Sequence, residues 1–247
     1  MAATLIVGNW KMNGLAADLD QARALAKALL RDGAPARVGL CPAATLISLM
    51  AKALVNTNVA VGGQDCRAEP AGAFTGDISA EMLADAGASL VIVGHSERRA
   101  GHGESDADVA AKALAAVRAG LEPIVCVGET LAERQAGRAL EVVTGQIRGS
   151  LPGALAGADF AVAYEPVWAI GTGLTPSLAE IEEMHTAIRR TLCELFGAAA
   201  SMPILYGGSV KPDNAGEILS AKEVGGALVG GASLKAADFL KIIEAAR

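Results

Sequence analysis

The sequence predicts an α/β protein in which eight parallel strands close into a single barrel with outer helices. Short apolar runs recur eight times along the 247 residues, and helical patterns separate them. The runs are almost continuously apolar, which is typical of parallel strands that are covered on both faces. Eight strand–helix units in about 250 residues match the count and length of a (β/α)8 barrel. We therefore expect one barrel domain over residues 1–247.

The expected strands are short and aliphatic, and most of them end at a glycine. They are Thr4–Gly8, Arg37–Cys41, Val59–Gly63, Leu90–Gly94, Ile124–Gly128, Phe160–Glu165, Ile204–Gly208 and Ala227–Gly231. An open doubly wound sheet is the alternative arrangement of such units. We disfavour it because no G-x-G-x-x-G fingerprint follows a strand and no change in composition marks a second domain.

Helical patterns fill the intervals between these strands. Ser105, with Asp108 three residues later, predicts a capped helix that Gly120 ends. Thr175 followed by Pro176 predicts an N-cap and a first helical residue. Further helices are expected over Leu15–Arg31, Ala44–Val55, Glu129–Arg148 and Leu234–Ala246, with shorter ones over Ile78–Ala86 and Pro212–Ser220.

Composition argues against several classes of protein. With 52% hydrophobic residues and a net charge of −6, the chain can bury a core and is not disordered. Its apolar runs are far shorter than the ~20 residues of a membrane helix, and no basic segment precedes an apolar stretch as an export signal would. The acidic balance argues against a nucleic-acid partner. The four cysteines form no C-x-x-C pair, so we expect reduced thiols in a cytoplasmic protein.

Four chemically useful side chains follow predicted strands. Asn9 and Lys11 come after the first strand, His95 follows the fourth, and Glu165 ends the sixth. The carboxyl ends of barrel strands meet at the face where active sites are built, so these side chains are expected to converge. Each has an ordinary alternative, since a lone lysine is usually a solvated charge and a lone histidine is often bonded to backbone. Glu165 ends a buried strand and therefore needs a partner, solvent or a proton.

The remaining two histidines carry no such signal. Neither His102, in a glycine-rich stretch, nor His185, in a helical one, has a second ligand at metal-binding spacing. We interpret both as structural and expect no metal.

Glycine pairs follow the last two strands, as Gly207-Gly208 before Ser209 and as Gly230-Gly231. Without a Cβ atom, a glycine lets its backbone N–H approach a phosphate closely. Barrels often bind phosphate with the loops after strands seven and eight. The two pairs together therefore indicate a phosphate site.

The segment after Glu165 has rigid ends, a glycine-rich stretch and apolar side chains that a plain solvated loop would not need. It is either a loop packed on the surface or a hinged lid that closes over a ligand. The lid residues are Pro166, Val167, Trp168, Ala169, Ile170, Gly171, Thr172 and Gly173.

Over essentially its whole length, the chain resembles the triosephosphate isomerase family. The motifs that carry the resemblance are GNWKMN at Gly8–Asn13, GAFTG at Gly72–Gly76, VGHSERR at Val93–Arg99, CVGE at Cys126–Glu129, AYEPVWAIGTG at Ala163–Gly173, YGGSV at Tyr206–Val210 and LVGGASL at Leu228–Leu234. Seven motifs in order, each at its strand end, are highly specific. The resemblance implies a TIM barrel that interconverts dihydroxyacetone phosphate and glyceraldehyde 3-phosphate, in glycolysis and gluconeogenesis.

The resemblance also implies catalytic roles. Glu165 would be the base that moves a carbon-bound proton through an enediolate. This family is a known example of catalytic groups whose pKa values are tuned by their surroundings. His95 would be a neutral hydrogen-bond donor to the substrate oxygens, because its place at a helix N-terminus disfavours the imidazolium. Lys11 would supply positive charge and Asn9 an amide, with Glu97 orienting Lys11.

The binding residues carried over from the family serve the substrate and the phosphate. They are Asn9, Lys11, Gly171, Ser209, Gly230 and Gly231. No metal or organic cofactor is implied, because only a proton moves. The family is usually a homodimer in which a loop, here 64–79 with Thr75 at its tip, inserts near the neighbouring site. In this loop, Asp65 and Asp77 stand where the family usually has Asn and Glu.

Two other functions remain open at this point. A Schiff-base aldolase-type barrel would use Lys11 as its nucleophile, but Lys11 follows the first strand and no other lysine ends a strand. A catalytically silent dimeric scaffold would not need the intact set of Asn9, Lys11, His95 and Glu165.

Overall fold

The computed structural model describes residues 4–170, 174–197 and 200–246, and in these eight parallel strands form a closed barrel in chain order. This confirms the predicted barrel and excludes the open sheet. The strands are β1 (Leu5–Asn9), β2 (Arg37–Cys41), β3 (Val59–Gly63), β4 (Leu90–Val93), β5 (Glu122–Val127), β6 (Ala161–Tyr164), β7 (Ile204–Tyr206) and β8 (Gly226–Val229). The sequence-based bounds are right to within about two residues.

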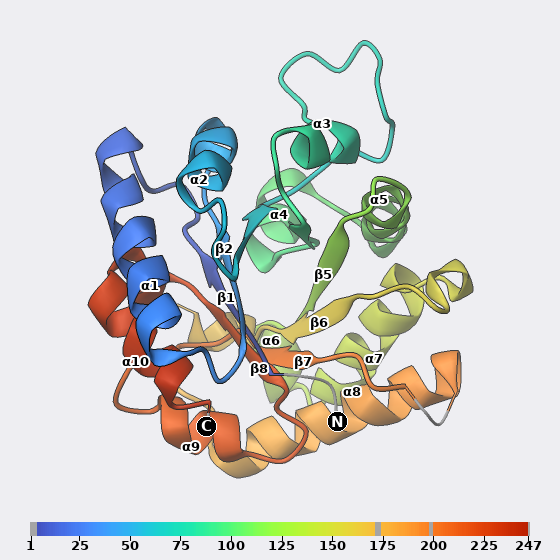
Figure 1. The fold of residues 1–247 in the computed structure, drawn as a ribbon. Coiled ribbons are helices and arrows are strands. Elements are labelled where there is room, and N and C mark those ends of the chain that lie inside the picture. The colour runs from blue at the N-terminus through green and yellow to red at the C-terminus, as the bar shows by residue number, and fades with distance from the viewer. Residues whose placement is uncertain (1–3, 171–173, 198–199, 247) are drawn as a thin grey trace.

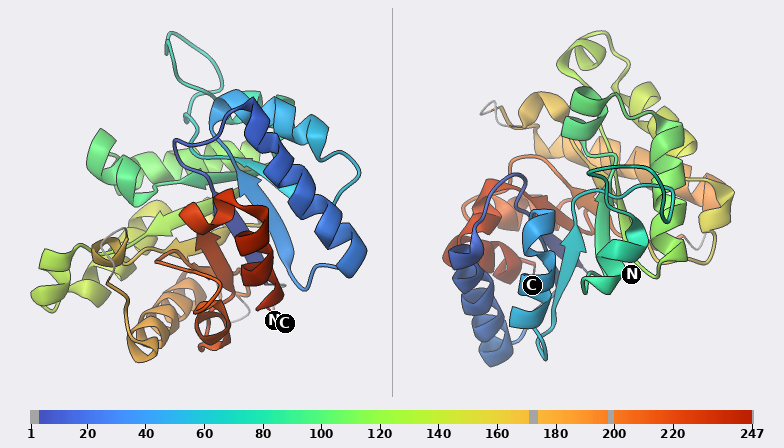
Figure 2. Two further views of the ribbon diagram at one scale, coloured as in Figure 1. Left: turned by 90° about the vertical axis from the view of Figure 1, so that its left-hand side faces the viewer. Right: turned by 90° about the horizontal axis from the view of Figure 1, so that it is seen from above.

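Helices surround the barrel on its outer side (Figure 1). They are α1 (Leu19–Asp32), α2 (Ile47–Ala53), α3 (Ala80–Asp85), α4 (Ser96–His102), α5 (Asp106–Arg118), α6 (Leu131–Gln135), α7 (Ala139–Ser150), α8 (Leu178–Phe196), α9 (Ala215–Ser220) and α10 (Ala236–Glu244). Between β3 and α3, the loop 64–79 projects beyond the helices, as Figure 1 and the left view of Figure 2 show.

Both faces of the strands are buried, which explains why the strand sequences are continuously apolar. Along β4, Leu90 and Ile92 point into the barrel while Val91 and Val93 point out to the helices, and all four are at most 2% exposed. The inner layer is small, with alanines on β6 and the thiols of Cys41 and Cys126. Helices and strands thus sandwich one continuous outer core around a tightly filled interior.

The barrel closes where β8 pairs with β1, with Leu5 opposite Gly226. Gly226 has a φ of +147°, and a methyl group on it would lie 1.9 Å from the carbonyl oxygen of Leu5. Only glycine allows this backbone approach. The seam therefore depends on the absence of one side chain.

One predicted helix start is wrong, and one predicted helix is in fact two. Helix α8 begins at Leu178, and its N-cap is Ser177 rather than Thr175, because Ser177 forms a capping box with Glu180. The expected helix Glu129–Arg148 is two helices, α6 and α7, with Gly137 between them at a φ of +72°. A glycine in the left-handed region ends the first helix, and apolar periodicity alone does not detect such a break.

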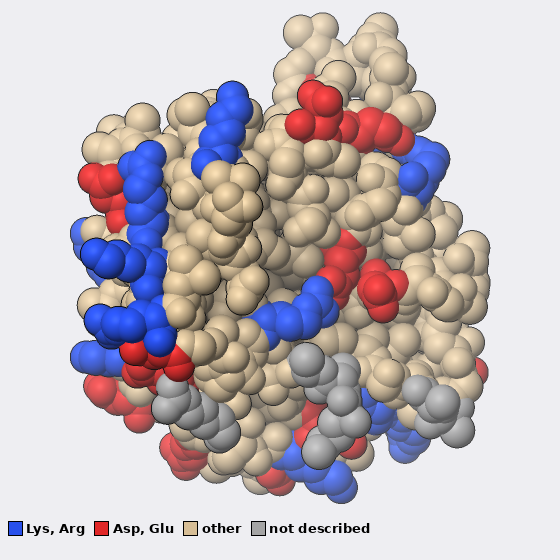
Figure 3. Space-filling model, viewed as in Figure 1, with Lys and Arg blue, Asp and Glu red and all other residues tan. Residues whose placement is uncertain are grey.

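All four cysteines are free. Among the described residues, no helix is both long and apolar enough to cross a membrane. On the described part of the face shown in Figure 3, Lys and Arg side chains gather over α1 and α10 with acidic side chains among them.

Because Ser177 is the cap of α8, Ser177→Ala should lower the free energy of unfolding by about 1 kcal/mol. The hydroxyl accepts from the Glu180 amide at 3.3 Å and donates to its carboxylate at 2.8 Å. Urea unfolding at fixed protein concentration measures the change. Thr175→Ala is the control and should alter stability by less than half as much; equal losses for both would contradict the assignment.

Candidate active site

The strand-end residues singled out from the sequence converge at the carboxyl face of the barrel. Asn9 ends β1, His95 and Ser96 follow β4, and Glu165 follows β6. Asn9, His95 and Glu165 are each at most 5% exposed. A carboxylate so buried must be bound by hydrogen-bond donors.

Glu165 has these donors at the start of α4. Its Oε2 accepts from the backbone N–H of Ser96 at 2.9 Å, and its Oε1 lies 2.9 Å from Nε2 of His95 and 3.3 Å from the Ser96 hydroxyl. Burial would raise the pKa of Glu165, but the His95 ring, the Ser96 amide and the Cys126 thiol outweigh it, so the pKa lies below its ordinary value. Glu165 is therefore held as a carboxylate.

His95 is the N-cap of α4, and this position defines which ring nitrogen carries the proton. Its Nδ1 accepts a hydrogen bond from the backbone N–H of Glu97 at 3.2 Å. An accepting Nδ1 is unprotonated, so the neutral ring carries its proton on Nε2, the atom beside Glu165. The imidazole thus presents an N–H donor to the interior of the site.

Lys11 lies at the rim of the same face. Its Nζ is 2.6 Å from Oε1 of Glu97, and its backbone N–H donates to Oδ1 of Asn9 at 3.0 Å. Gln64 donates to the Lys11 carbonyl at 2.9 Å. The backbone of Lys11 has a φ of +53°, unusual for a residue with a side chain. These three contacts hold a cation in a conformation that it would rarely adopt alone.

The two glycine turns also reach this face. Gly207 donates to the carbonyl of Tyr164 at 2.7 Å, which ties the turn after β7 to the strand that carries Glu165. A methyl group on Gly230 would lie 3.6 Å from Cε of Lys11, so the turn after β8 lies beside the lysine. Ser209 lies partly exposed in the first turn and Gly231 begins a short 3-10 helix. Gly171, Thr172 and Gly173 lie outside the described residues.

The first half of the expected lid rests on a buried carboxylate that sequence reasoning missed. Glu129 is fully buried, and its Oε1 accepts from Nε1 of Trp168 at 2.9 Å and from the Tyr164 hydroxyl at 3.1 Å. Arg134 pairs with the same oxygen at 3.1 Å and stacks over the Trp168 ring. A carboxylate directly after the fifth strand was the available signal, since it matches the position of Glu165 after the sixth.

His185 packs against the rings of Tyr164 and Tyr206, which also contact each other. It is fully buried, and its Nδ1 contacts the Glu223 carbonyl at 3.2 Å. Burial lowers its pKa to about 4. His102 is the exposed last residue of α4. Within the described ranges, no cluster of three His, Cys, Asp or Glu residues could hold a metal ion.

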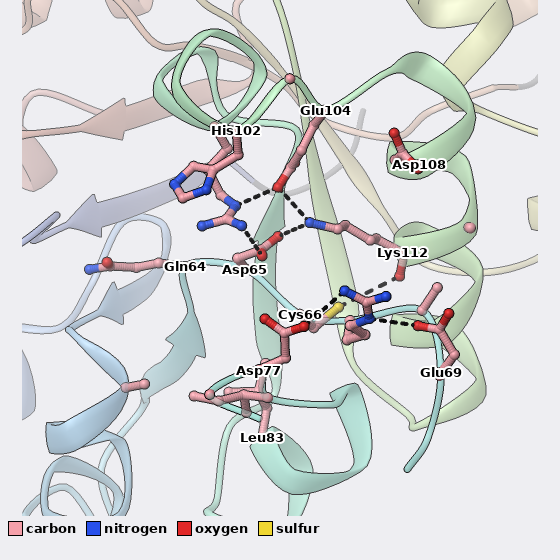
Figure 4. Close-up of a pocket in the computed structure, with 18 of the residues that line it drawn as sticks. Gln64, Asp65, Cys66, Glu69, Asp77, Leu83, His102, Glu104, Asp108 and Lys112 are labelled. Carbon is pink, nitrogen blue, oxygen red and sulfur yellow. Dashed lines mark hydrogen bonds and ion pairs between the residues drawn. The ribbon is translucent and has the colours of Figure 1, made fainter. Parts of the chain in front are cut away.

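The loop 64–79 borders a pocket of about 570 Å³ (Figure 4). Asp65 pairs with Lys112 at 2.8 Å and with Arg98 at 2.9 Å, while burial raises its pKa. Asp77 pairs with Arg67 at 2.8 Å. Asp65 and Asp77, the two departures from the family pattern, thus both form ion pairs within the chain. Thr75, at the tip of the loop, is exposed.

Several known proteins are similar to this chain over nearly its whole length. The model of a family described as triosephosphate isomerase matches residues 4–246. Triosephosphate isomerase from Caulobacter vibrioides is 61% identical over 242 residues, covering 98% of this chain and 96% of that protein. The same-named protein from Ruegeria sp. is 57% identical over 246 residues, covering 99% and 98%. A crystal structure of triosephosphate isomerase from Bartonella henselae has a TM-score of 0.92 at 47% identity, covering 99% of both chains.

A closed (β/α)8 barrel with a buried carboxylate, an imidazole and a lysine at its carboxyl face is the architecture of an acid–base enzyme. The matches place it more narrowly. The chain belongs to the triosephosphate isomerase family. This confirms the resemblance seen in the motifs, and it excludes the aldolase-type barrel and the silent scaffold.

The burial of His185 should make stability depend on pH. The unfolded chain binds this proton near pH 6.5, whereas the folded chain binds it only near pH 4. Between these values the unfolded state holds more protons, so stability is lost as the pH falls, by up to about 3 kcal/mol over the window.

Urea unfolding at pH 7 and pH 4.5 measures this loss, and His185→Gln should show much less of it. His102→Gln is the control, because His102 is exposed and should leave the pH dependence as in the wild type. Equal acid sensitivity in wild type and His185→Gln would contradict the account.

Proposed function

We propose that Glu165, His95, Lys11 and Asn9 carry out the reaction of the family at this site. That reaction is the interconversion of dihydroxyacetone phosphate and D-glyceraldehyde 3-phosphate, a step of glycolysis. It moves a carbonyl by one carbon, which requires a base for a carbon-bound proton and stabilisation of the enediolate formed between. The contact between the Glu165 carboxylate and the Nε2 proton of His95 is the observation that carries the assignment.

Glu165 supplies the base in this proposal. In the structure its carboxylate accepts a hydrogen bond from the N–H of Ser96. To take a proton from a substrate carbon, the carboxylate must release this hydrogen bond and move toward the substrate. Its low pKa keeps it ionised before substrate arrives. Exclusion of water when the lid closes then strengthens it as a base.

His95 and Lys11 stabilise the charge that develops on the substrate oxygens. The neutral imidazole donates from Nε2, because its Nδ1 already accepts from the Glu97 backbone N–H. Lys11, held by Glu97 at 2.6 Å, brings a fixed positive charge. The side-chain amide of Asn9 is free to donate, because its oxygen is the atom that accepts from Lys11.

The phosphate would bind to the backbone N–H groups of Ser209, Gly230 and Gly231, together with Gly171. The proximity of Gly230 to Lys11 supports this assignment, since a dianion there would lie beside the cation. Residues 166–173 would act as the lid, with Trp168 anchored on Glu129 at the hinge. Lid closure would protect the enediolate from loss of phosphate. The reaction needs neither metal nor organic cofactor.

We further propose that two copies of this chain form a homodimer. The side chains of Met12 and Leu15 are 96% and 76% exposed, although both are apolar. The pocket in Figure 4 is lined in part by Gln64, whose side chain donates to the carbonyl of Lys11, the residue before Met12. The tip of a second copy's loop, at Thr75, would fill this pocket and so bear on the active site. We infer a cytoplasmic enzyme that acts as one barrel domain, without a nucleic-acid or membrane partner.

Shortening the base should slow the reaction strongly. Glu165→Asp withdraws the carboxylate by about 1 Å, which should lower kcat about 100-fold. A coupled assay with glyceraldehyde 3-phosphate measures it. Glu141→Asp makes the same change on the exposed face of α7 and should leave kcat unchanged. Wild-type turnover with an unaffected Glu165→Asp variant would remove Glu165 from the role of base.

The dimer should depend on the tip of the loop. Thr75→Arg brings a long charged side chain into the pocket of the second copy and should convert the dimer largely to monomer at micromolar concentration, as sedimentation velocity measures. Ala179→Arg, exposed on α8, is the control and should stay dimeric. A monomeric wild type, or a dimeric Thr75→Arg variant, would refute the proposed interface.

A further inference from the structure

The backbone around Glu165 is hydrogen-bonded to residues 127–129, at the end of β5 and just after it. The N–H of Glu165 donates to the carbonyl of Val127 at 2.8 Å, and the N–H of Val167 donates to the carbonyl of Glu129 at 3.1 Å. Along the chain, these two bonds lie on either side of Gly128 in the segment after β5 and on either side of Pro166 in the segment after β6. The position of Glu165 and of the first lid residues therefore follows the position of residues 127–129.

Gly128 touches Glu165 directly. A methyl group on Gly128 would lie 1.8 Å from the backbone oxygen of Glu165 and 2.8 Å from its carbonyl carbon. No side chain fits between the backbones of Gly128 and Glu165, so the two residues are packed in direct contact. A shift of Gly128 is transmitted to Glu165.

One side chain from the outer helices fixes Gly128. Gln146 on α7 accepts from the Gly128 N–H through Oε1 at 2.7 Å and donates from Nε2 to the Gly128 carbonyl at 3.0 Å. The amide thus satisfies both backbone groups of one residue, as a neighbouring strand would. A glycine without a Cβ has wide conformational freedom, and this pair of bonds removes it.

We propose that Gln146 is a positioning residue for Glu165, acting through Gly128. The inference rests on the proposed role of Glu165 as the base. Gln146 approaches the site from behind β5, and its two bonds set where the carboxylate stands. Its loss should therefore affect the chemical step more than substrate binding.

Two variants test this role. Gln146→Leu removes both hydrogen bonds and should lower kcat about 10- to 100-fold with KM changed less than threefold. Gln146→Glu keeps the shape, but its carboxylate can only accept, so the Gly128 carbonyl loses its donor. Protonation of that carboxyl restores one donor and one acceptor. The kcat of Gln146→Glu relative to wild type should therefore rise as the pH falls from 8 to 5, whereas the ratio for Gln146→Leu stays flat.

The control is Arg148→Leu, which removes the tie of α7 to Glu194 on α8 without touching residues 127–129. It should leave kcat within twofold of wild type. Circular dichroism establishes that each variant is folded. Should Gln146→Leu not fold, the pH-dependent recovery of Gln146→Glu decides.

A wild-type kcat in folded Gln146→Leu, or a pH-independent ratio for Gln146→Glu, overturns the proposal. Combination with Glu165→Asp separates it from the proposed function. If Gln146 acts through the base, the loss caused by Gln146→Leu should shrink at least threefold in the Glu165→Asp background. An unimpaired Glu165→Asp variant would instead show that the assignment of the base is at fault, and full additivity would refute the role of Gln146.

Discussion

The start of α4 is the element on which the rest of the site depends. One backbone N–H, from Ser96, binds the buried carboxylate of Glu165, and the next, from Glu97, binds Nδ1 of His95. The first amides of a helix have no partner within the helix, so they are free for this use. The same two donors keep an acid ionised and an imidazole neutral, and these are the charge states that proton transfer between carbon atoms requires.

The barrel makes this arrangement possible by bringing distant strands to one edge. Asn9, His95 and Glu165 come from β1, β4 and β6, yet lie at a single face because parallel strands all end there. The barrel interior is too small and too apolar to solvate a charge, so the polar groups gather above it and bind one another. Outer helices contribute as well, since Gln146 reaches the end of β5 from α7.

The strands, and the meeting of Asn9, His95 and Glu165 at one face, could be predicted from sequence because both depend on local signals: apolar runs, and the polar residues that end or follow them. Helix starts were less predictable, since Thr175 and Ser177 are both good caps and only the capping box with Glu180 distinguishes them. Glu129 was missed because its role is defined by Trp168 and Tyr164, which are distant in sequence. For Gln146, no pattern along the chain shows that its side chain reaches Gly128.

The seam at Gly226 has a consequence for the order of folding. Strand β1 is made first, but one of its two neighbours is the last strand of the chain. Until β8 arrives, the backbone groups on that edge of β1 remain unpaired, and an unpaired edge invites association with other chains. Closing a ring through nearly the whole polypeptide also carries the largest loop entropy in the molecule. One edge of β1 therefore stays unpaired throughout synthesis of the chain, and the barrel has no free strand edge only once β8 has paired with β1.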